Sequence, residues 1–257
     1  MSVLDTIIKG VLEDANDRKI SDGRLMEMIA AAPAPKNFLE NLGNRAVIAE
    51  IKRSSPSKGN LAEIPDPVSL AKIYEASGAS AISVLTERRR FGGSLTDLQA
   101  VRSEINLPIL RKDFLANEYL VRESRAFGAD LALLIVAALD NAQLKAFYEL
   151  VIELGMTPLI EVHSEEELER ALQLGPKLIG VNARNLKTLE VDSTLFQRLL
   201  PLIPKEVVKV AESGISDAGE ASSAFNSGAD VILVGEALVK SSEPGKTLAR
   251  FLTGATE

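Results

Sequence analysis

The sequence predicts an α/β fold built as a (β/α)8 barrel, the TIM-barrel class, with an N-terminal helical extension. Eight short apolar or β-branched segments recur along the 257 residues, and helix-like segments separate them. Three of the eight are entered by nearly the same residues, SGASAISVL, FGADLALLI and SGADVILVG, which indicates a repeated βα unit. Segments apolar on both faces are typical of a parallel sheet covered by helices. Eight such units in about 210 residues fit a barrel, and a doubly wound open sheet is the alternative.

The helical extension is predicted over about residues 1–45, before the first strand. Its segment VLDTIIKGVLEDA carries apolar residues three and four apart, the spacing of an amphipathic helix. Such a helix either covers one barrel end as a structural element or closes as a flap over a ligand, and the sequence leaves both interpretations open. Prolines in AAPAPKNF end any helix before the first strand. Because no linker or low-complexity segment divides the chain, we expect one domain over residues 1–257.

The predicted strands follow in a regular order and alternate with helices such as DNAQLKAFYELVIELG and SEEELERALQLG. In the three repeated segments, we expect the glycine before the strand to cap the preceding helix. The eight strand segments are AVIAEIK, AISVLTE, LPILRKDF, DLALLIVAAL, TPLIEVH, KLIGVNAR, VVKVAES and DVILVGEAL.

Composition narrows the functional classes. Hydrophobic residues make up 46% and charged residues 25% of the chain, as in ordinary soluble proteins, and no apolar run reaches the ~20 residues of a membrane span. The start MSVLDTIIKG carries an early aspartate and lacks the basic start of a signal peptide, so we expect a cytoplasmic protein without a membrane partner. A net charge of -7 argues against nucleic acid as the main partner.

The chain contains no cysteine and a single histidine. This composition excludes disulfides, thiolate nucleophiles and zinc clusters, and all but excludes a Ser-His-Asp triad. Catalysis would therefore rest on lysine, glutamate, aspartate and asparagine, without a metal ion or a cofactor.

Polar side chains gather at the ends of five predicted strands, where a barrel carries its chemistry. Glu50 and Lys52 lie two residues apart and so share one face of the first strand. The remaining groups are Lys112, Glu161, Asn182 with Arg184 just beyond, and Glu212. Charges inside a barrel mouth cost several kcal/mol unless they pair with each other or with a ligand. Their convergence predicts an active site at this end.

The loops after the last two predicted strands begin ESGIS and VGEAL. Loops at these positions of a barrel often bind phosphate through main-chain N–H groups, and the small residues Ser213, Gly214 and Gly235 would let an anion approach the main chain. After the first strand, SSPSKG offers further hydroxyls, although a plain solvated turn is an equal interpretation.

Three other features have simpler interpretations. His163 follows its strand directly, which favours a loop or helix-capping role. The three arginines of ERRRFGGS indicate a solvated loop, in which Phe91 could line a pocket. Lys209 has the opposite strand parity to Glu212 and should face the helical layer.

Seven segments, in order, resemble the signature segments of the indole-3-glycerol phosphate synthase family: AEIKRSSPSKG, FGGS, PILRKDF, PLIEVH, GVNARNL, VAESGI and LVGEALV. The resemblance spans nearly the whole chain. It implies a (β/α)8 barrel whose extension helps to cover the active site. It also implies conversion of 1-(2-carboxyphenylamino)-1-deoxyribulose 5-phosphate to indole-3-glycerol phosphate, with loss of carbon dioxide and water and without a cofactor.

Carried over residue by residue, the resemblance makes Lys112 the general acid and Glu161 its acid–base partner. The other catalytic groups it implies are Glu50, Lys52, Asn182 and Glu212. Its substrate contacts are Arg184 near the carboxylate, Phe91, Phe114 and Leu133 around the aromatic ring, and Ser55, Ser213, Gly214 and Gly235 at the phosphate. Glu236 departs from relatives that have a small hydroxyl residue there, and we expect its carboxylate to point away from the phosphate. The expected partner is the phosphorylated substrate, with a monomeric chain that associates at most weakly with other tryptophan-pathway enzymes.

Two other functions remain open on the residues alone. One is another phosphate-binding barrel, an isomerase or epimerase, which would need one acid and one base rather than several converging polar groups. The other is a barrel that binds a phosphorylated metabolite without catalysis, which would not require Lys112 and Glu161 together.

Overall fold

Eight parallel strands close into a barrel in the order β1-β10-β9-β8-β7-β6-β5-β4, because β1 pairs with both β10 and β4. The computed structural model describes residues 2–40 and 42–254, and residues 1, 41 and 255–257 of the predicted domain lie outside the described residues. Each barrel strand falls within one of the eight predicted segments, and closure excludes the open sheet. The strands are β1 Ala46–Ile51, β4 Ala81–Leu85, β5 Ile109–Lys112, β6 Leu131–Ile135, β7 Thr157–Val162, β8 Leu178–Asn182, β9 Val208–Glu212 and β10 Val231–Val234.

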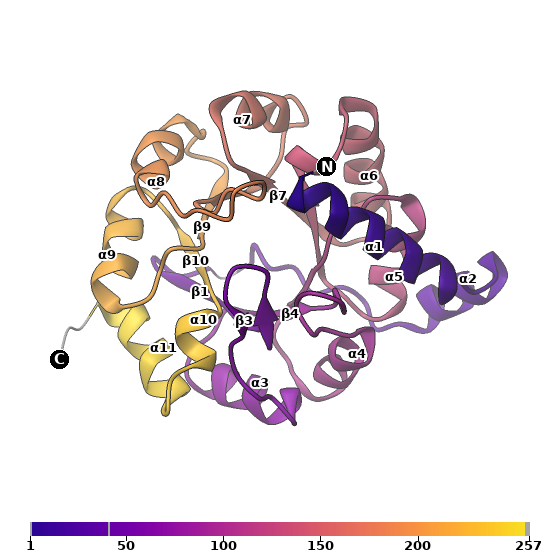
Figure 1. Cartoon of the computed structure of the whole chain (residues 1–257), viewed down its shortest axis with the longest axis horizontal. Coiled ribbons are helices and arrows are strands. Elements are labelled where there is room, and N and C mark those ends of the chain that lie inside the picture. Colours follow the sequence, from indigo (N-terminus) through magenta and orange to yellow (C-terminus); the bar gives the residue numbers. More distant parts are fainter. Residues whose placement is uncertain (1, 41, 255–257) are drawn as a thin grey trace.

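Helices surround the barrel, as seen down its axis in Figure 1. Several begin at a side chain that accepts a main-chain N–H of the first turn, including Asp66, Ser94, Asn117, Asp140, Ser164 and Asp217. The helices after β1 are α3 Pro67–Ala76, α4 Leu95–Glu104, α5 Glu118–Ala126, α6 Asn141–Glu153, α7 Glu165–Leu172, α8 Thr194–Leu199, α9 Ala218–Asn226, α10 Glu236–Val239 and α11 Pro244–Thr253, with 3-10 turns η1 Val136–Ala138 and η2 Leu200–Leu202.

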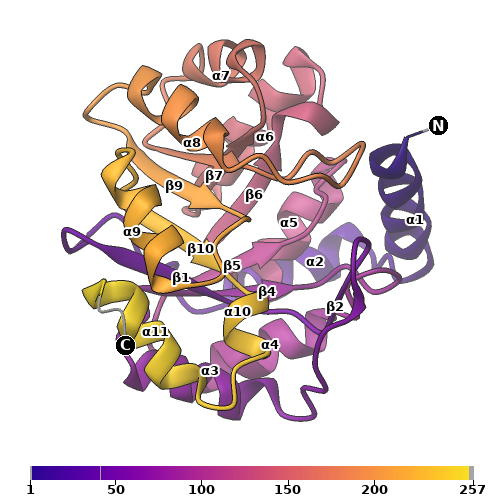
Figure 2. The ribbon, with the colours of Figure 1, turned by 60° about the vertical axis from the view of Figure 1, so that its left-hand side comes forward.

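The loop after β1 forms a small antiparallel hairpin that the sequence interpretation did not anticipate. Its strands, β2 Ser54–Ser55 and β3 Gly59–Asn60, pair across the turn that contains Pro56. The hairpin stands beside the barrel opening in Figures 1 and 2. The segment SSPSKG is therefore an ordered structure at the barrel mouth.

The N-terminal extension consists of α1 Val3–Asp17 and α2 Asp22–Ala31. The predicted amphipathic face of α1 buries Leu4, Ile7 and Val11, because the apolar spacing places them on one side. Figures 1 and 2 show α1 at the mouth end of the barrel, on the side of α5 and α6, while α2 packs on α5. The helix thus lies at the rim of the barrel mouth.

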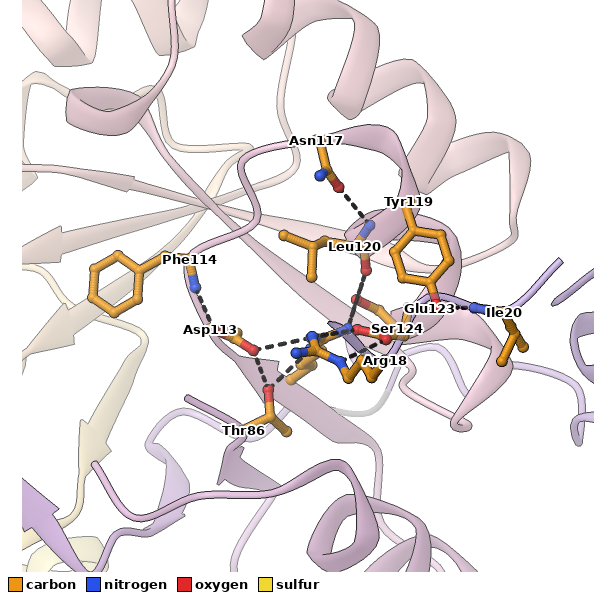
Figure 3. A network of polar contacts seen from close by, with 11 residues as sticks. Arg18, Ile20, Thr86, Asp113, Phe114, Asn117, Tyr119, Leu120, Glu123 and Ser124 are labelled. Carbon is orange, nitrogen blue, oxygen red and sulfur yellow. Dashed lines mark hydrogen bonds and ion pairs between the residues drawn. The ribbon is translucent and has the colours of Figure 1, made fainter. Parts of the chain in front are cut away.

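A buried charge network joins α1 to the barrel wall (Figure 3). Arg18, directly after α1, donates to both carboxylate oxygens of Glu123 on α5, at 2.9 and 2.8 Å. Arg111 on β5 is fully buried and donates to the same Glu123 at 3.0 Å and to Asp113 at 2.9 Å. Glu123 therefore connects the extension to the strand that ends at Lys112.

We expect Glu123→Ala to lower the free energy of unfolding by about 3–5 kcal/mol, because it removes a carboxylate shared by two arginines, one of them fully buried. Urea unfolding followed by circular dichroism measures the loss. The matched control is Glu27→Ala, which breaks the exposed pair with Arg24 and should cost less than about 1 kcal/mol. An equal effect of the two substitutions would contradict a stabilising role for the network.

Candidate active site

A cavity of about 670 Å³ lies at the barrel end where the strands finish, beside α1. Ile7 of α1 contributes to its wall. The structure brings all the residues predicted to be catalytic, substrate-binding or phosphate-binding into this one cavity: Glu50, Lys52, Ser55, Phe91, Lys112, Phe114, Leu133, Glu161, Asn182, Arg184, Glu212, Ser213, Gly214 and Gly235. Their individual roles remain predictions.

Glu50 and Lys52 form the first ion pair of the cavity. Their positions on one face of the strand end bring Lys52 Nζ to 2.6 Å from Glu50 Oε1. Glu50 is buried, and Ser83 of β4 lies 3.4 Å from its other carboxylate oxygen. The opposite charges of this strand end therefore neutralise each other within the site.

Lys112 lies between two carboxylates from other strands. Its Nζ donates to Glu161 Oε2 of β7 at 2.9 Å and lies 3.3 Å from Glu212 Oε2 of β9. Both glutamates are almost completely buried. Neither oxygen of Glu212 has an aligned hydrogen bond within the described residues, although both are buried.

Lys112, Glu161 and Glu212 shift one another's pKa values in different directions. Burial alone would lower the pKa of Lys112, but Glu161 and Glu212 raise it well above its ordinary value. Burial would raise the pKa of Glu161, but Lys112 and His163 hold it well below its usual range. Burial and the neighbouring Glu161 raise the pKa of Glu212 to about 8, against the pull of Lys112. These opposite shifts favour a cationic lysine and make Glu212 take up a proton more readily than Glu161.

Two glycines leave room for the carboxyl groups. A Cβ on Gly180 of β8 would lie 2.1 Å from Glu212 Oε1, and a Cβ on Gly235 would lie 2.5 Å from Glu50 Oε1. Any side chain at either position would displace a glutamate. Gly235 thus makes space for Glu50 as well as for the predicted phosphate.

Asn182 and Arg184 shape the wall beyond β8. Asn182 Oδ1 accepts the main-chain N–H of Arg184 at 3.0 Å, which fixes the start of the loop. The Arg184 guanidinium donates to the Leu189 carbonyl at 3.0 Å and to Ser57 Oγ at 3.3 Å. It therefore links the loop after β8 to the hairpin after β1 at the cavity rim.

Apolar side chains line part of the same cavity. Phe91 and Phe114 pack with ring centroids 6.1 Å apart at an interplanar angle of 39°. Leu133 of β6 lines the same cavity. Such a surface suits a flat aromatic ligand.

The loops after β9 and β10 form the third side of the cavity. Ser213 has a φ of 66°, a left-handed conformation that is costly for a residue with a side chain, and Gly214 follows with a φ of 70°. Gly235 caps α10 without a side-chain hydrogen bond. The main chain here is held in an unusual conformation at a small-residue surface, and the anion site stays a prediction.

Glu236 lies on the cavity wall beside this surface. Its Oε1 accepts hydrogen bonds from Lys58 Nζ at 2.7 Å and from Lys240 Nζ at 2.8 Å. Two lysines neutralise its carboxylate, and its expected orientation away from the phosphate stays a prediction.

Three residues near the site had no catalytic interpretation from the sequence: His163, Ser83 and Gly180. The loop or capping role expected for His163 is incomplete, because its Nε2 lies 3.3 Å from Glu161 Oε1. The signal for His163 was its spacing of two residues from Glu161, which puts both on one side of the chain. A glycine within an apolar strand was the signal for Gly180.

The arginines of ERRRFGGS, expected in a solvated loop, include one with a structural role. Arg89 pairs with Glu13 and Asp14 of α1, at 2.7 and 2.8 Å. It therefore helps to hold this helix beside the cavity.

Lys209 of β9 lies outside the cavity wall and is 4.0 Å from Asp230, consistent with the predicted outward parity.

Residues 2–40 and 42–254 contain no group of three or more histidine, cysteine, aspartate or glutamate side chains that could hold a metal ion. Within the same ranges, none of the helices has the length and apolar character needed to cross a membrane.

Comparison with known proteins assigns the family. The family model for indole-3-glycerol phosphate synthase matches residues 4–251. The chain belongs to the indole-3-glycerol phosphate synthase family. Indole-3-glycerol phosphate synthase of Micrococcus luteus is 53% identical to it over 98% of this chain and 97% of the relative. The enzyme of the same name from Streptomyces griseus subsp. griseus is 54% identical over 97% and 94% of the two chains. The chain is therefore a lyase of tryptophan biosynthesis.

Solved structures of low sequence identity share the fold. The structure of 3-hexulose-6-phosphate synthase from Salmonella typhimurium has a TM-score of 0.67 at 13% identity and covers 81% of this chain and 97% of its own. N-acetylmannosamine-6-phosphate 2-epimerase from Clostridium perfringens has a TM-score of 0.62 at 16% identity, with coverages of 84% and 95%. These similarities confirm the barrel class of the synthase family member and carry no further functional information.

In this synthase family member, we expect Gly180→Ala to lower kcat by about 10²-fold, because the added methyl group displaces the Glu212 carboxyl group from its position beside Lys112. Steady-state kinetics measures the change. The matched control is Gly23→Ala in α2, where the added methyl group meets no atom within 4 Å and activity should be unchanged. Full activity of Gly180→Ala in a folded protein would mean that the position of Glu212 does not matter.

Proposed function

We propose that the chain closes the indole ring of 1-(2-carboxyphenylamino)-1-deoxyribulose 5-phosphate by Lys/Glu general acid–base catalysis and releases indole-3-glycerol phosphate, carbon dioxide and water. The observation that carries the proposal is the placement of Lys112 between Glu161 and Glu212 in a buried cavity. The aromatic side chains that line the same cavity offer a place for the substrate ring. An isomerase or epimerase would need neither these aromatic side chains nor so many converging polar groups.

Ring closure is the step assigned to Lys112. The aromatic carbon attacks the substrate carbonyl, and the carbonyl oxygen needs a proton as the bond forms. The raised pKa of Lys112, caused by its two carboxylate neighbours against the effect of burial, keeps it protonated at neutral pH. Lys112 therefore serves as the general acid. Loss of carbon dioxide from the closed ring then restores its aromatic character.

Dehydration needs a base and an acid on neighbouring groups. Glu161 is ionised and can take the proton, while Glu212, whose burial raises its pKa to about 8, can give one to the departing hydroxyl group. Two carboxyl groups beside one lysine thus take opposite roles. Glu50, Lys52 and Asn182 complete the polar surface around the reacting atoms.

Substrate binding is assigned to the remaining walls. Phe91, Phe114 and Leu133 would hold the aromatic ring, and Arg184 would pair with the substrate carboxylate. Ser55 and the main chain at Ser213, Gly214 and Gly235 would bind the phosphate. The open N-terminus of α10 supports this assignment, because its first N–H groups lack a side-chain cap.

We expect Lys112→Ala to lower kcat by about 10²- to 10⁴-fold, the usual range for a positioned general acid. Formation of indole-3-glycerol phosphate from the synthetic substrate, followed by absorbance, measures the rate, and circular dichroism checks the fold. The matched control is Lys209→Ala, which removes a strand lysine outside the cavity and should leave kcat within about threefold of the wild type. A folded Lys112→Ala protein with near wild-type activity would remove Lys112 from the mechanism.

For the phosphate, we expect Gly235→Val to raise the Kd of a phosphorylated product analogue by roughly tenfold, about 1.4 kcal/mol, and to change that of its dephosphorylated counterpart little. The side chain would block the main chain and also move Glu50, so kcat should fall as well. Calorimetric titration of both ligands measures the affinities. Gly180→Ala, which moves a carboxyl group without touching this loop, should not show the difference between ligands. Equal weakening of both ligands by Gly235→Val would place the phosphate elsewhere.

We also propose that the enzyme works in the cytoplasm as a monomer, with its phosphorylated substrate as the main partner and at most weak association with other tryptophan-pathway enzymes. Its family and net charge of -7 are compatible with this setting and with a partner other than nucleic acid. Sedimentation analysis of the purified chain tests the monomeric state.

A further inference from the structure

His163 lies behind Glu161, on the side away from Lys112. Its Nε2 is 3.3 Å from Glu161 Oε1, whereas Lys112 Nζ contacts Glu161 Oε2 at 2.9 Å. The two oxygens of one carboxylate therefore face two different nitrogen groups. Because Nε2 has no aligned hydrogen bond among the described residues, its link to Glu161 depends mainly on charge.

The other edge of the imidazole is held by the start of α7. His163 Nδ1 lies 3.1 Å from Glu167 Oε2, and the main-chain N–H of His163 donates to the same oxygen at 2.8 Å. Glu167 lies in the first turn of α7, where the helix N-terminus favours a carboxylate. The ring is thereby fixed between two acidic groups, and only its doubly protonated form can donate to both.

The surroundings of His163 favour this cationic form. Its side chain is only 10% exposed, and burial alone would lower its pKa, but Glu161 and Glu167 raise it to about 9. A second cavity beside the ring is lined by three further charged groups: Glu190 and Asp192 of the loop after β8, and Arg198 of α8. Acidic groups thus outnumber the single arginine around the imidazole.

We propose that His163 is a positioning residue for Glu161: its imidazolium, fixed by Glu167, holds the carboxylate toward Lys112 and keeps it ionised. This inference rests on the proposed role of Glu161 as a catalytic base. His163 makes no contact with the reacting atoms in this scheme and acts only through Glu161.

Loss of the imidazolium has a defined effect on pH dependence. A positive charge beside a carboxylate favours its ionised form, so removal of that charge raises the pKa of Glu161. When the pH is lowered, Glu161 then becomes protonated at a higher pH than in the wild type, and the activity that needs its ionised form is lost there. In the wild type the imidazolium is present below about pH 9, so it acts over the whole acidic range.

The test is the pH dependence of kcat/KM for His163→Gln, whose neutral amide retains a hydrogen-bond donor near Glu161. We expect the acidic limb to move upward by about one pH unit or more relative to the wild type. Glu167→Gln, which leaves the ring but weakens its protonation, should move the limb in the same direction by a smaller amount.

Ser164→Ala is the matched control, because it removes the side-chain cap of α7 and leaves the imidazole in place. It should lower the melting temperature without moving the acidic limb. If His163→Gln lowers the melting temperature but leaves the limb unchanged, or if Ser164→Ala moves the limb equally, the inference is wrong. Glu161→Gln distinguishes failure of this inference from failure of the proposed function. An active Glu161→Gln enzyme would overturn the proposed role of Glu161 itself.

Discussion

The balance of charge inside the barrel mouth is the constraint on which the rest of the site depends. Glu50, Lys112, Glu161 and Glu212 come from β1, β5, β7 and β9, which are alternate strands of the closed sheet. Alternate strands of such a barrel supply one layer of interior side chains, usually branched and apolar. Here that layer is ionisable. It is stable only because each buried carboxyl group either pairs with a cation or carries a proton. The glycines on β8 and after β10 provide the space that these larger groups need.

Strand β5 carries charged side chains on both of its faces. Arg111 of β5 lies in the network between the barrel and the helices, whereas the next residue, Lys112, points into the cavity. The charge network of Arg111 connects β5 to α5 and to the end of α1. Contacts on the helical side of the barrel therefore fix the strand that carries the proposed general acid. His163 and Glu167 support β7 in a comparable way. Precise geometry in the site therefore depends on contacts made in the outer layer.

Much of this arrangement could be predicted from local sequence patterns. Apolar runs identified the eight strands, and the period of two placed Glu50 with Lys52 and turned Lys209 outward. Distances across the barrel could not be obtained in this way. The need for glycine at Gly180 arises from a carboxyl group on another strand, and the contacts of His163 depend on how α7 begins. Likewise, Lys58 meets Glu236 only after closure brings β1 beside β10. Local periodicity carries no information on such long-range pairs.

The tether of α1 also orders the events of folding during synthesis. Arg18 leaves the ribosome before its partner Glu123, which follows 105 residues later. The helix therefore has no docking site until α5 has been made. Closure of the barrel waits longer still, since Ala46 pairs with Val231 near the other end of the chain. Contacts of such high sequence separation form slowly because a long loop must first be closed. Helix α1 is thus among the elements that depend on later parts of the chain for their final position.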